Sequence, residues 1–451
     1  MFIMEGQNME FFEKKKTDLI KQFNILKKNG PIRIEKKTSN LFRNRNQVSK
    51  PKLNVGNFNS IISIDTKNHV VDVEGMTTYE DLVNETLKED FMPSVVPQLK
   101  TITVGGAYTG GGIESASFKY GFVHETVLEA EILLSSGETA VCNSTKNKDL
   151  FFGYPNSYGT LGYVLRLKIK LIPVKKYVHL KYIKTNPEKM FNKMDELVKE
   201  GQLDFLDGVV FSEEESYIVI GKFTDKAPYT SNYTYMKIFY KSIKERSEDY
   251  LTTLDYLWRW DTDWFWCSEH FLVQKPLIRF FWGKRNLNSK TYHKIMGLNA
   301  KYKLMDKIPI KKKETESVIQ DVEIPLENAY KFIKFFMEKI GIWPVWVCPT
   351  KAYKKNVKFD LYITNPDKLY FNFGFWDQVP LKNKENEGYY NRLVEKEVLR
   401  LNGKKSLYSS SYFPEEEFWN VYNGKKYFQL KKKYDKNKVF LNLYEKCVLR
   451  K

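Results

Sequence analysis

The stretch from Thr103 to Ser115 restricts the fold of this chain more than any other, because five glycines fall within it. Glycine adopts positive φ without steric cost and has no Cβ, so backbone N–H groups in such a stretch can approach an anionic or planar ligand. No Gly-Lys-Ser/Thr follows, and the spacing is not G-x-G-x-x-G, so a Walker loop and a Rossmann fingerprint are both excluded. A flexible glycine-rich surface loop remains the alternative.

The segments around the glycines predict an α+β protein. Alternating apolar residues at 61–64 and 70–73 predict a β-hairpin, and 78–87 predicts a helix. The run 165–173 has the pattern of a strand. Strands and helices therefore mix in this part of the chain, which is typical of an α+β arrangement. Farther on, 359–363 and 369–373 are also predicted to be strands.

The order of motifs after the glycines gives a more specific signal. Lys119-Tyr120-Gly121 follows them, then Gly159-Thr160-Leu161-Gly162, and then Ile172-Pro173-Val174-Lys175-Lys176-Tyr177-Val178. Together with Thr103-Val104-Gly105-Gly106, this order resembles the flavin-binding domain of the vanillyl-alcohol oxidase family, which has the PCMH-type FAD fold. Within that family the motifs are most similar to the Δ24-sterol reductase (DIMINUTO) branch.

The resemblance implies an organisation for the whole chain. Residues 1–176 are expected to form a PCMH-type FAD-binding domain, and 177–400 a smaller α+β substrate (cap) domain. Residues 401–451 are expected to return to the FAD domain. The implied FAD contacts are Thr103, Val104, Gly105, Gly106, Thr109, Gly110, Gly111, Gly112, Ile113, Glu114, Ser115, Gly159, Thr160, Gly162 and Val164.

The segment 36–43 departs from the family pattern. Family members often carry a glycine-rich pyrophosphate loop here, in some cases with a histidine bonded to the flavin, and this chain has neither glycine nor histidine. We therefore expect non-covalent FAD, with Thr38 and Ser39 among the phosphate contacts, next to Lys37 and Asn40. A polar turn between strands is the alternative for this segment.

The reaction implied by the resemblance is reduction of a carbon–carbon double bond of a sterol-like lipid, with NADPH as electron donor. Such a reaction needs a proton donor near the flavin. The candidates are Glu114, Lys119, Tyr120 and Tyr412, with Tyr408 as a further tyrosine. Burial would raise the pKa of Glu114 and keep it protonated, although a structural hydrogen bond explains this residue equally well.

Two alternatives keep the fold and change the function. One is a flavin oxidase or dehydrogenase of an alcohol or sugar, and the other is a non-catalytic lipid-binding or scaffold protein. A sterol requires a long apolar cavity, whereas a sugar requires several convergent polar groups. The aromatic residues between 240 and 285 favour the sterol if they line such a cavity, but core packing or a bilayer interface would also explain them.

Composition narrows the partners and the location. The net charge of +18 comes from lysines and arginines spread along the whole chain, which favours a solvated surface or a membrane surface over nucleic acid, since no nucleic-acid-binding motif is present. Four widely spaced cysteines indicate neither a zinc site nor a disulfide framework, and no other metal site is expected. Residues 1–30 lack the apolar run of a signal peptide or membrane span. The expected location is cytoplasmic, with peripheral membrane association as an open option, and the oligomeric state is not predicted.

Overall fold

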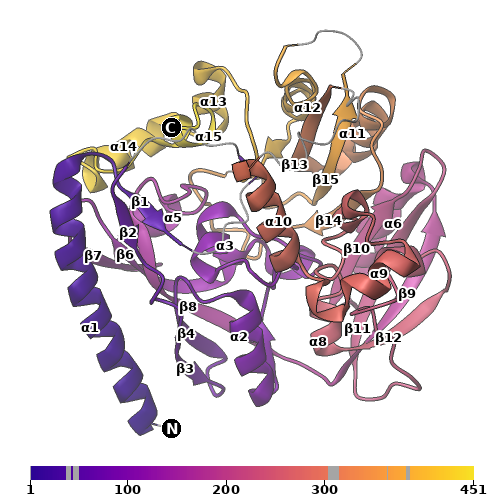
Figure 1. Cartoon of the computed structure of the whole chain (residues 1–451), viewed down its shortest axis with the longest axis horizontal. Coiled ribbons are helices and arrows are strands. Elements are labelled where there is room, and N and C mark those ends of the chain that lie inside the picture. Colours follow the sequence, from indigo (N-terminus) through magenta and orange to yellow (C-terminus); the bar gives the residue numbers. More distant parts are fainter. Residues whose placement is uncertain (1, 37–41, 44–49, 303–313, 363, 382–385) are drawn as a thin grey trace.

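The computed structural model describes residues 2–36, 42–43, 50–302, 314–362, 364–381 and 386–451 (Figure 1). Its strands form two large antiparallel sheets, one in each half of the chain, and a small parallel pair of β1 and β2, with helices around them. The predicted α+β class is confirmed. None of the described helices combines the length and the apolar character that crossing a membrane requires.

The first sheet has six strands in the order β3-β4-β8-β6-β7, with β5 paired to β8. Valines and isoleucines that alternate along these strands place one face of the sheet in the core, beside α2 and α3. The elements of this half are α1 (Phe2–Leu26), β1 (Arg33–Glu35), β2 (Lys52–Asn54), β3 (Ile61–Asp65), β4 (Val70–Glu74), α2 (Tyr79–Thr86), β5 (Phe91–Pro93), α3 (Val104–Gly110), α4 (Ser117–Tyr120), β6 (Val127–Leu133), β7 (Thr139–Asn143), α5 (Lys148–Gly153) and β8 (Tyr163–Pro173).

The second sheet has eight strands in the order β12-β9-β11-β10-β14-β15-β13-β16. Helices α6, α11 and α12 cover one of its faces, with a core rich in phenylalanine. The elements are β9 (Tyr177–Thr185), α6 (Pro187–Glu200), β10 (Phe205–Val210), β11 (Ser216–Thr224), α7 (Phe239–Ser242), β12 (Glu248–Thr252), α8 (Thr253–Leu257), α9 (Pro276–Trp282), α10 (Ser289–Tyr302), β13 (Thr315–Pro325), α11 (Leu326–Lys339), β14 (Val345–Thr350), β15 (Tyr370–Pro380), α12 (Tyr389–Arg400) and β16 (Lys404–Lys405).

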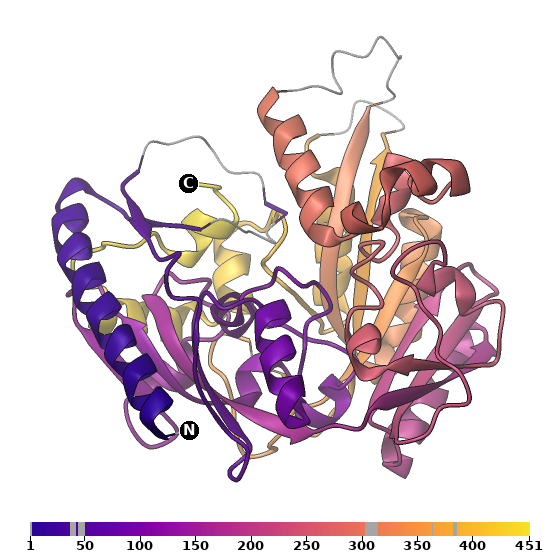
Figure 2. The same ribbon diagram turned by 60° about the horizontal axis from the view of Figure 1, so that its bottom comes forward.

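After β16 the chain returns to the first half. Helices α13 (Glu415–Val421), α14 (Gly424–Tyr434) and α15 (Leu443–Cys447) lie on that side of the molecule (Figure 2). Two hydrogen bonds fix α14 there: Ser135 Oγ donates to the Tyr434 carbonyl at 2.9 Å, and Tyr427 Oη donates to Thr160 Oγ1 at 2.9 Å. The C-terminal segment therefore helps to cover the glycine-rich region.

Most of the predicted elements are present. The hairpin is β3 and β4, paired antiparallel, and the helix predicted at 78–87 is α2, capped by Thr78 Oγ1, which accepts the Asp81 N–H. The strand predicted at 359–363 is wrong for the described residues 359–362, which form turns. Phe359 and Tyr362 are buried, so the apolar residues of this segment pack into the core without forming a strand.

Candidate functional site

The glycine-rich stretch forms a short helix, α3, where a loop was predicted. Thr103 caps it, because its Oγ1 accepts the Gly106 N–H at 3.2 Å, and Gly111 ends it with φ of 72°. The N–H groups of Val104 and Gly105 already donate to the carbonyls of Thr77 and Gly75, at 2.9 and 2.8 Å. These two N–H groups are therefore occupied by the protein and are not available to a ligand.

The two adjacent glycines Gly105 and Gly106 have different neighbours. A Cβ on Gly105 would lie 2.6 Å from the Gly75 carbonyl oxygen and 2.7 Å from Val164 Cγ1, so Gly105 permits close contact between α3 and the sheet. A Cβ on Gly106 would meet only Thr103 Oγ1, at 2.8 Å, and Gly106 is exposed toward the cavity described next. Only Gly106 leaves open space that a ligand can use.

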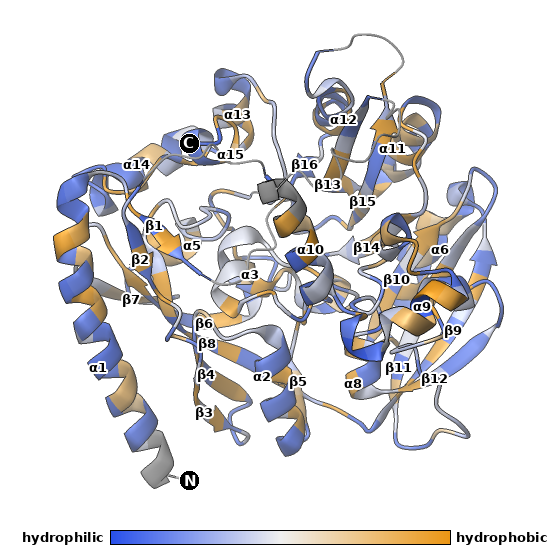
Figure 3. Ribbon diagram, in the orientation of Figure 1, coloured by the Kyte–Doolittle hydropathy of each residue, from blue (hydrophilic) through white to orange (hydrophobic). Residues whose placement is uncertain are grey.

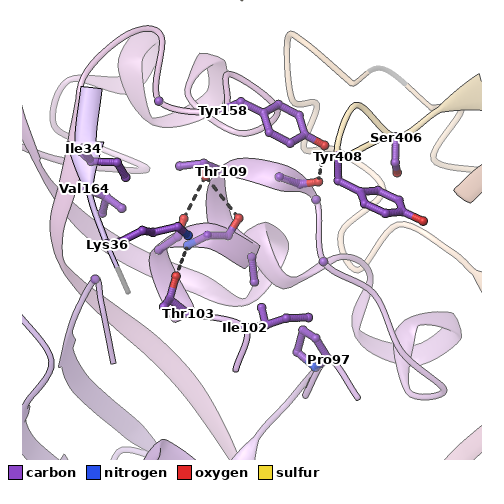
Figure 4. Close-up of a pocket in the computed structure, with 18 of the residues that line it drawn as sticks. Ile34, Lys36, Pro97, Ile102, Thr103, Thr109, Tyr158, Val164, Ser406 and Tyr408 are labelled. Carbon is purple, nitrogen blue, oxygen red and sulfur yellow. Dashed lines mark hydrogen bonds between the residues drawn. The ribbon is translucent and has the colours of Figure 1, made fainter. Parts of the chain in front are cut away.

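A cavity of about 380 Å³ lies along α3, within the usual size range of ligand sites. Ile34 and Lys36, at the end of β1, line it on one side of α3, and Ser406 and Tyr408, after β16, line it on the other (Figure 4). Thr109 lies between them, with its Oγ1 donating to the carbonyls of Gly105 and Gly106 at 3.0 and 3.2 Å. Segments far apart in the sequence thus meet around the glycine-rich helix.

The structure brings most of the predicted FAD contacts into this cavity. Those that line it are Thr103, Gly105, Gly106, Thr109, Gly110, Gly111, Gly112, Ile113, Gly159, Thr160 and Val164. Four others, Val104, Glu114, Ser115 and Gly162, are buried in the protein and are not among the lining residues. Thr38 and Ser39, with Lys37 and Asn40, lie outside the described residues.

Basic side chains dominate the charge of the cavity. Its charged lining residues are Arg33, Lys36, Arg43, Lys446, Lys451 and, as the only acid among the described lining residues, Asp321. Arg33 Nη2 is buried without a hydrogen-bond partner among the described residues. Burial lowers the pKa of the nearby Lys50, and the positive charges of Arg33 and Lys451 lower it further. A wall with surplus positive charge and an unpaired guanidinium nitrogen fits an anionic group such as the diphosphate of FAD.

Glu114 belongs to a buried polar cluster between the two halves. Its carboxyl accepts Ser115 Oγ and the Ala116 N–H, at 2.7 and 2.8 Å, and burial raises its pKa to about 7 despite the nearby Arg259 guanidinium. Ser115 Oγ also lies 2.8 Å from Tyr256 Oη, and Arg259 pairs with Asp207 at 2.8 Å. The pKa of Glu114 is therefore raised by burial, and its partners are structural residues of the protein.

The structure also places the remaining predicted acids away from the cavity lining. Lys119 is exposed and lies 3.4 Å from Asp204, and the Tyr120 ring packs against Tyr353. The Tyr412 ring lies beside the Arg392 and Arg450 guanidinium groups. Of the tyrosines considered from the sequence, Tyr408 alone lines the cavity.

Aromatic side chains from the second half cover the opposite wall of the cavity. They are Trp264, Phe265, Trp346 and Trp376, joined by Phe42 from the first half. Their rings contact one another. The ring centroid of Phe265 lies 4.4 Å from that of Trp376 and 5.6 Å from that of Trp346, and Phe42 stacks on Trp264 with 5.5 Å between ring centroids. This wall is apolar and fits a flat apolar molecule better than a sugar.

Asp321 and Tyr408 are the polar groups within this aromatic wall, and the sequence did not point to Asp321. The Trp376 indole N–H donates to Tyr408 Oη at 2.9 Å, and Tyr408 in turn interacts with the Asp321 carboxyl. Burial raises the pKa of Asp321 to about 7. Asp321 and Glu323 are two acids in the largely buried second half of β13, and acids at such positions are the signal that could have identified the site.

Comparison with known proteins agrees with this geometry. The family described as "FAD binding domain" matches residues 14–143. The chain is similar to Delta(24)-sterol reductase of Homo sapiens, with 27% identity over 411 residues that cover 86% of this chain and 76% of the relative. The Arabidopsis thaliana protein of the same name is 26% identical over 88% of this chain and 76% of its own length. Cytokinin dehydrogenase 3 of Arabidopsis thaliana is 30% identical, over 31% of this chain and 27% of its own.

These matches confirm the resemblance read from the motifs. The chain contains an FAD-binding domain of the PCMH type, and the likeness to the sterol reductases extends over most of its length, including the second sheet. The glycine-rich helix and the basic residues Arg33, Lys36 and Arg43 lie within the matched residues 14–143, whereas Lys446 and Lys451 of the basic wall belong to the C-terminal segment.

Proposed function

We propose that this chain is an FAD-dependent oxidoreductase that reduces a carbon–carbon double bond of a sterol-like lipid. The observation that carries the proposal is the two-sided cavity. One wall has glycines and basic side chains suited to the dinucleotide, and the other has an aromatic surface suited to a flat apolar substrate. The relatives that cover most of the chain are named Delta(24)-sterol reductases, which agrees with this substrate class.

FAD, when bound, supplies the hydride for the reduction. The lining residues of α3 and of the segment 158–160 are the proposed contacts, and Arg33, Lys36 and Arg43 offer positive charge to its phosphates. Non-covalent binding is proposed. NADPH is the proposed electron donor, because alkene reduction consumes two electrons in each turnover and NADPH delivers both as a hydride.

We further propose that the halves act as separate functional domains. Residues 1–176 with 401–451 hold FAD, and 177–400 cover the substrate. The last strand of the first sheet ends at Pro173, and the second sheet begins at Tyr177, which agrees with a boundary near 176. The pairing of Ser135 with Tyr434 supports assignment of the C-terminal segment to the FAD domain.

Peripheral membrane association is proposed on the basis of α9. Leu277, Phe280 and Phe281 on this helix are 76%, 60% and 82% exposed, and the helix is apolar in Figure 3. Exposed basic residues flank them: Lys275, Lys284, Arg285 and Lys290. An exposed apolar helix with a basic border is suited to the interface of an anionic bilayer. Helix α10, which follows, contacts the cavity wall through His293 against Trp264, so a lipid substrate would enter near this surface.

Product analysis tests the proposed reaction. The purified FAD-loaded protein is incubated with NADPH and desmosterol, a Δ24-unsaturated sterol, and the sterols are analysed by mass spectrometry. The proposal predicts a product heavier by two hydrogen atoms, formed only when both NADPH and protein are present. An unchanged sterol, together with oxidation of an added alcohol or sugar, would identify the alternative oxidase function.

A further inference from the structure

We propose that Asp321 is the acid that donates a proton to the substrate alkene, with Tyr408 as its positioning partner. This inference rests on the proposed function, because it assigns a role within the same reduction. Asp321 lies on β13 of the second sheet, and Tyr408 follows β16, the strand that pairs with β13. Nothing in the glycine-rich region or its motifs points to either strand.

Asp321 is placed where an acid can reach a ligand in the cavity. It lines the cavity, and it lies within the aromatic wall formed by Trp264, Phe265, Trp346 and Trp376. Its Oδ1 has no hydrogen-bond partner among the described residues. One carboxyl oxygen is therefore unused by the protein, although the group lies in an apolar enclosure where an unpaired polar atom is costly.

The surrounding residues hold the carboxyl in this position. Gly374 is the cross-strand partner of Asp321, and a Cβ there would lie 2.7 Å from Asp321 Oδ1 and 2.6 Å from the Trp376 ring. Glycine at 374 therefore leaves room for both groups. Tyr408 Oη accepts the Trp376 N–H at 2.9 Å, which leaves its own hydrogen directed to another acceptor, and Asp321 is the group it interacts with.

The proton balance follows from this arrangement. A hydride and its electron pair arrive at one alkene carbon from the cofactor side of the cavity. The π electrons of the double bond form a new C–H bond at the other carbon with the proton of Asp321, whose O–H bond breaks. Asp321 is left as a carboxylate, and a proton from solvent restores it before the next turnover.

The electrostatic surroundings keep Asp321 in the donor form. Burial raises its pKa to about 7, and Tyr408 lowers that pKa by hydrogen bonding. The titratable groups coupled to it are Tyr408, Glu323 on its own strand, and Tyr158 from the loop before β8. Below about pH 7 the carboxyl therefore carries the proton that the reaction requires.

Glu323 offers a matched control for Asp321. It lies two residues along the same strand, and burial raises its pKa to about 7 as well. Its carboxyl accepts Thr350 Oγ1 at 2.7 Å and Asn372 Nδ2 at 2.9 Å, and it does not line the cavity. Glu323→Gln removes a buried acid whose pKa is raised to a similar value, without changing the cavity wall.

The test compares the two half-reactions in the wild type, Asp321→Asn and Glu323→Gln, all loaded with FAD. Flavin reduction by NADPH is recorded first under anaerobic conditions, and reoxidation by the unsaturated sterol second. Asp321→Asn is expected to keep NADPH reduction within about threefold and to slow reoxidation by sterol at least about a hundredfold, the usual contribution of a general acid. Glu323→Gln is expected to retain both rates.

A second readout does not depend on activity. Infrared spectra of the same proteins show the C=O stretch of protonated carboxylic acids, which is lost on ionisation. A band that disappears in Asp321→Asn and that titrates near pH 7 in the wild type is expected. Asp321→Ala, which adds no volume beside Gly374, provides a second variant if the asparagine protein does not fold.

The outcomes separate the two levels of the proposal. If the wild type does not reduce the sterol, the proposed function fails, and the role of Asp321 in that reaction fails with it. If the wild type reduces the sterol and Asp321→Asn does so equally fast, the assignment of Asp321 is overturned. Infrared spectra in which the Asp321 carboxyl is ionised throughout pH 5 to 7 would also overturn the assignment.

Discussion

At the scale of single residues, Gly105 and Gly106 have different roles: Gly105 permits close packing, and Gly106 leaves space in the cavity. Gly105 lies against the Gly75 carbonyl and Val164, whereas Gly106 is open to the cavity. Both are glycines in one motif, and the sequence pattern could not distinguish packing of the protein from contact with a ligand. The difference depends on β4 and β8, which approach α3 from distant parts of the chain.

Substitution of the two glycines should therefore have separable effects. Gly105→Ala is expected to destabilise the protein by about 1–3 kcal/mol through overpacking. Gly106→Val should lower the free energy of unfolding by no more than about 1 kcal/mol, mainly because it disturbs the Thr103 cap. It should nevertheless abolish FAD retention, because the side chain enters the cavity. Urea unfolding of the apoproteins and the flavin absorbance of the purified proteins measure the two effects. Normal FAD content in folded Gly106→Val would contradict the assignment of the cavity.

Tyr408→Phe tests the pH dependence of sterol reduction. Asp321 donates as the protonated acid, so the rate of flavin reoxidation by sterol should be flat below about pH 7 and should fall above it. Because Tyr408 lowers the pKa of Asp321, loss of its hydroxyl should move this fall to higher pH. The pH profile of single-turnover rates measures it. A shift to lower pH would refute the pairing, and loss of the reaction at every pH would make Tyr408 itself the donor.

At the scale of elements, α9 carries the proposed membrane contact. The double variant Leu277→Ser and Phe281→Ser removes two exposed apolar side chains without touching the core, so folding should not change. Burial of these side chains contributes roughly 1.5–3 kcal/mol each to interfacial binding. Sedimentation with anionic vesicles should therefore weaken at least about tenfold in the variant.

Two comparisons control this experiment. The double variant Leu128→Ser and Phe428→Ser changes exposed apolar residues of the other half and should leave vesicle binding unaffected. Salt should weaken the binding of the wild type, because charges at the surface are screened. Equal sedimentation of all three proteins would show that α9 is not the contact.

The elements themselves could largely be predicted from the chain. Alternating valines and isoleucines predicted β3 and β4, and the helical pattern at 78–87 predicted α2, because these signals are local. The pairing of β13 with β15 is not local, and it is this pairing that brings Asp321 and Trp376 together. Trp264 and Phe265 of the cavity wall lie in the aromatic stretch 240–285 noted from the sequence, whereas Asp321, which this pairing brings beside them, was missed.

At the scale of the whole molecule, a buried polar cluster joins the two halves, and its centre is an ion pair within the second half. Arg259 pairs with Asp207 at 2.8 Å, and both side chains are almost fully buried. Trp346 Nε1 donates to the same carboxyl at 3.1 Å, so the pair also positions a residue of the cavity wall. On the side of the first half, Glu114 and Ser115 complete the cluster.

Arg259→Met should destabilise the protein by about 3–5 kcal/mol, because it leaves Asp207 buried without its partner. Lys88→Ala provides the control, since Lys88 pairs with Glu85 and the two side chains are 64% and 49% exposed. That change should alter the free energy of unfolding by less than about 1 kcal/mol. Urea unfolding measures both. Similar losses for the two variants would show that the buried pair of Arg259 and Asp207 stabilises the fold no more than a surface pair does.

The central claim is that one cavity holds both FAD and an alkene substrate. Anaerobic absorbance spectroscopy of the FAD-loaded protein tests it most directly, with NADPH added first and desmosterol second. NADPH should bleach the flavin, and the sterol should then restore the oxidised spectrum. Bleaching by an alcohol or a sugar, with recovery only in air, would contradict it.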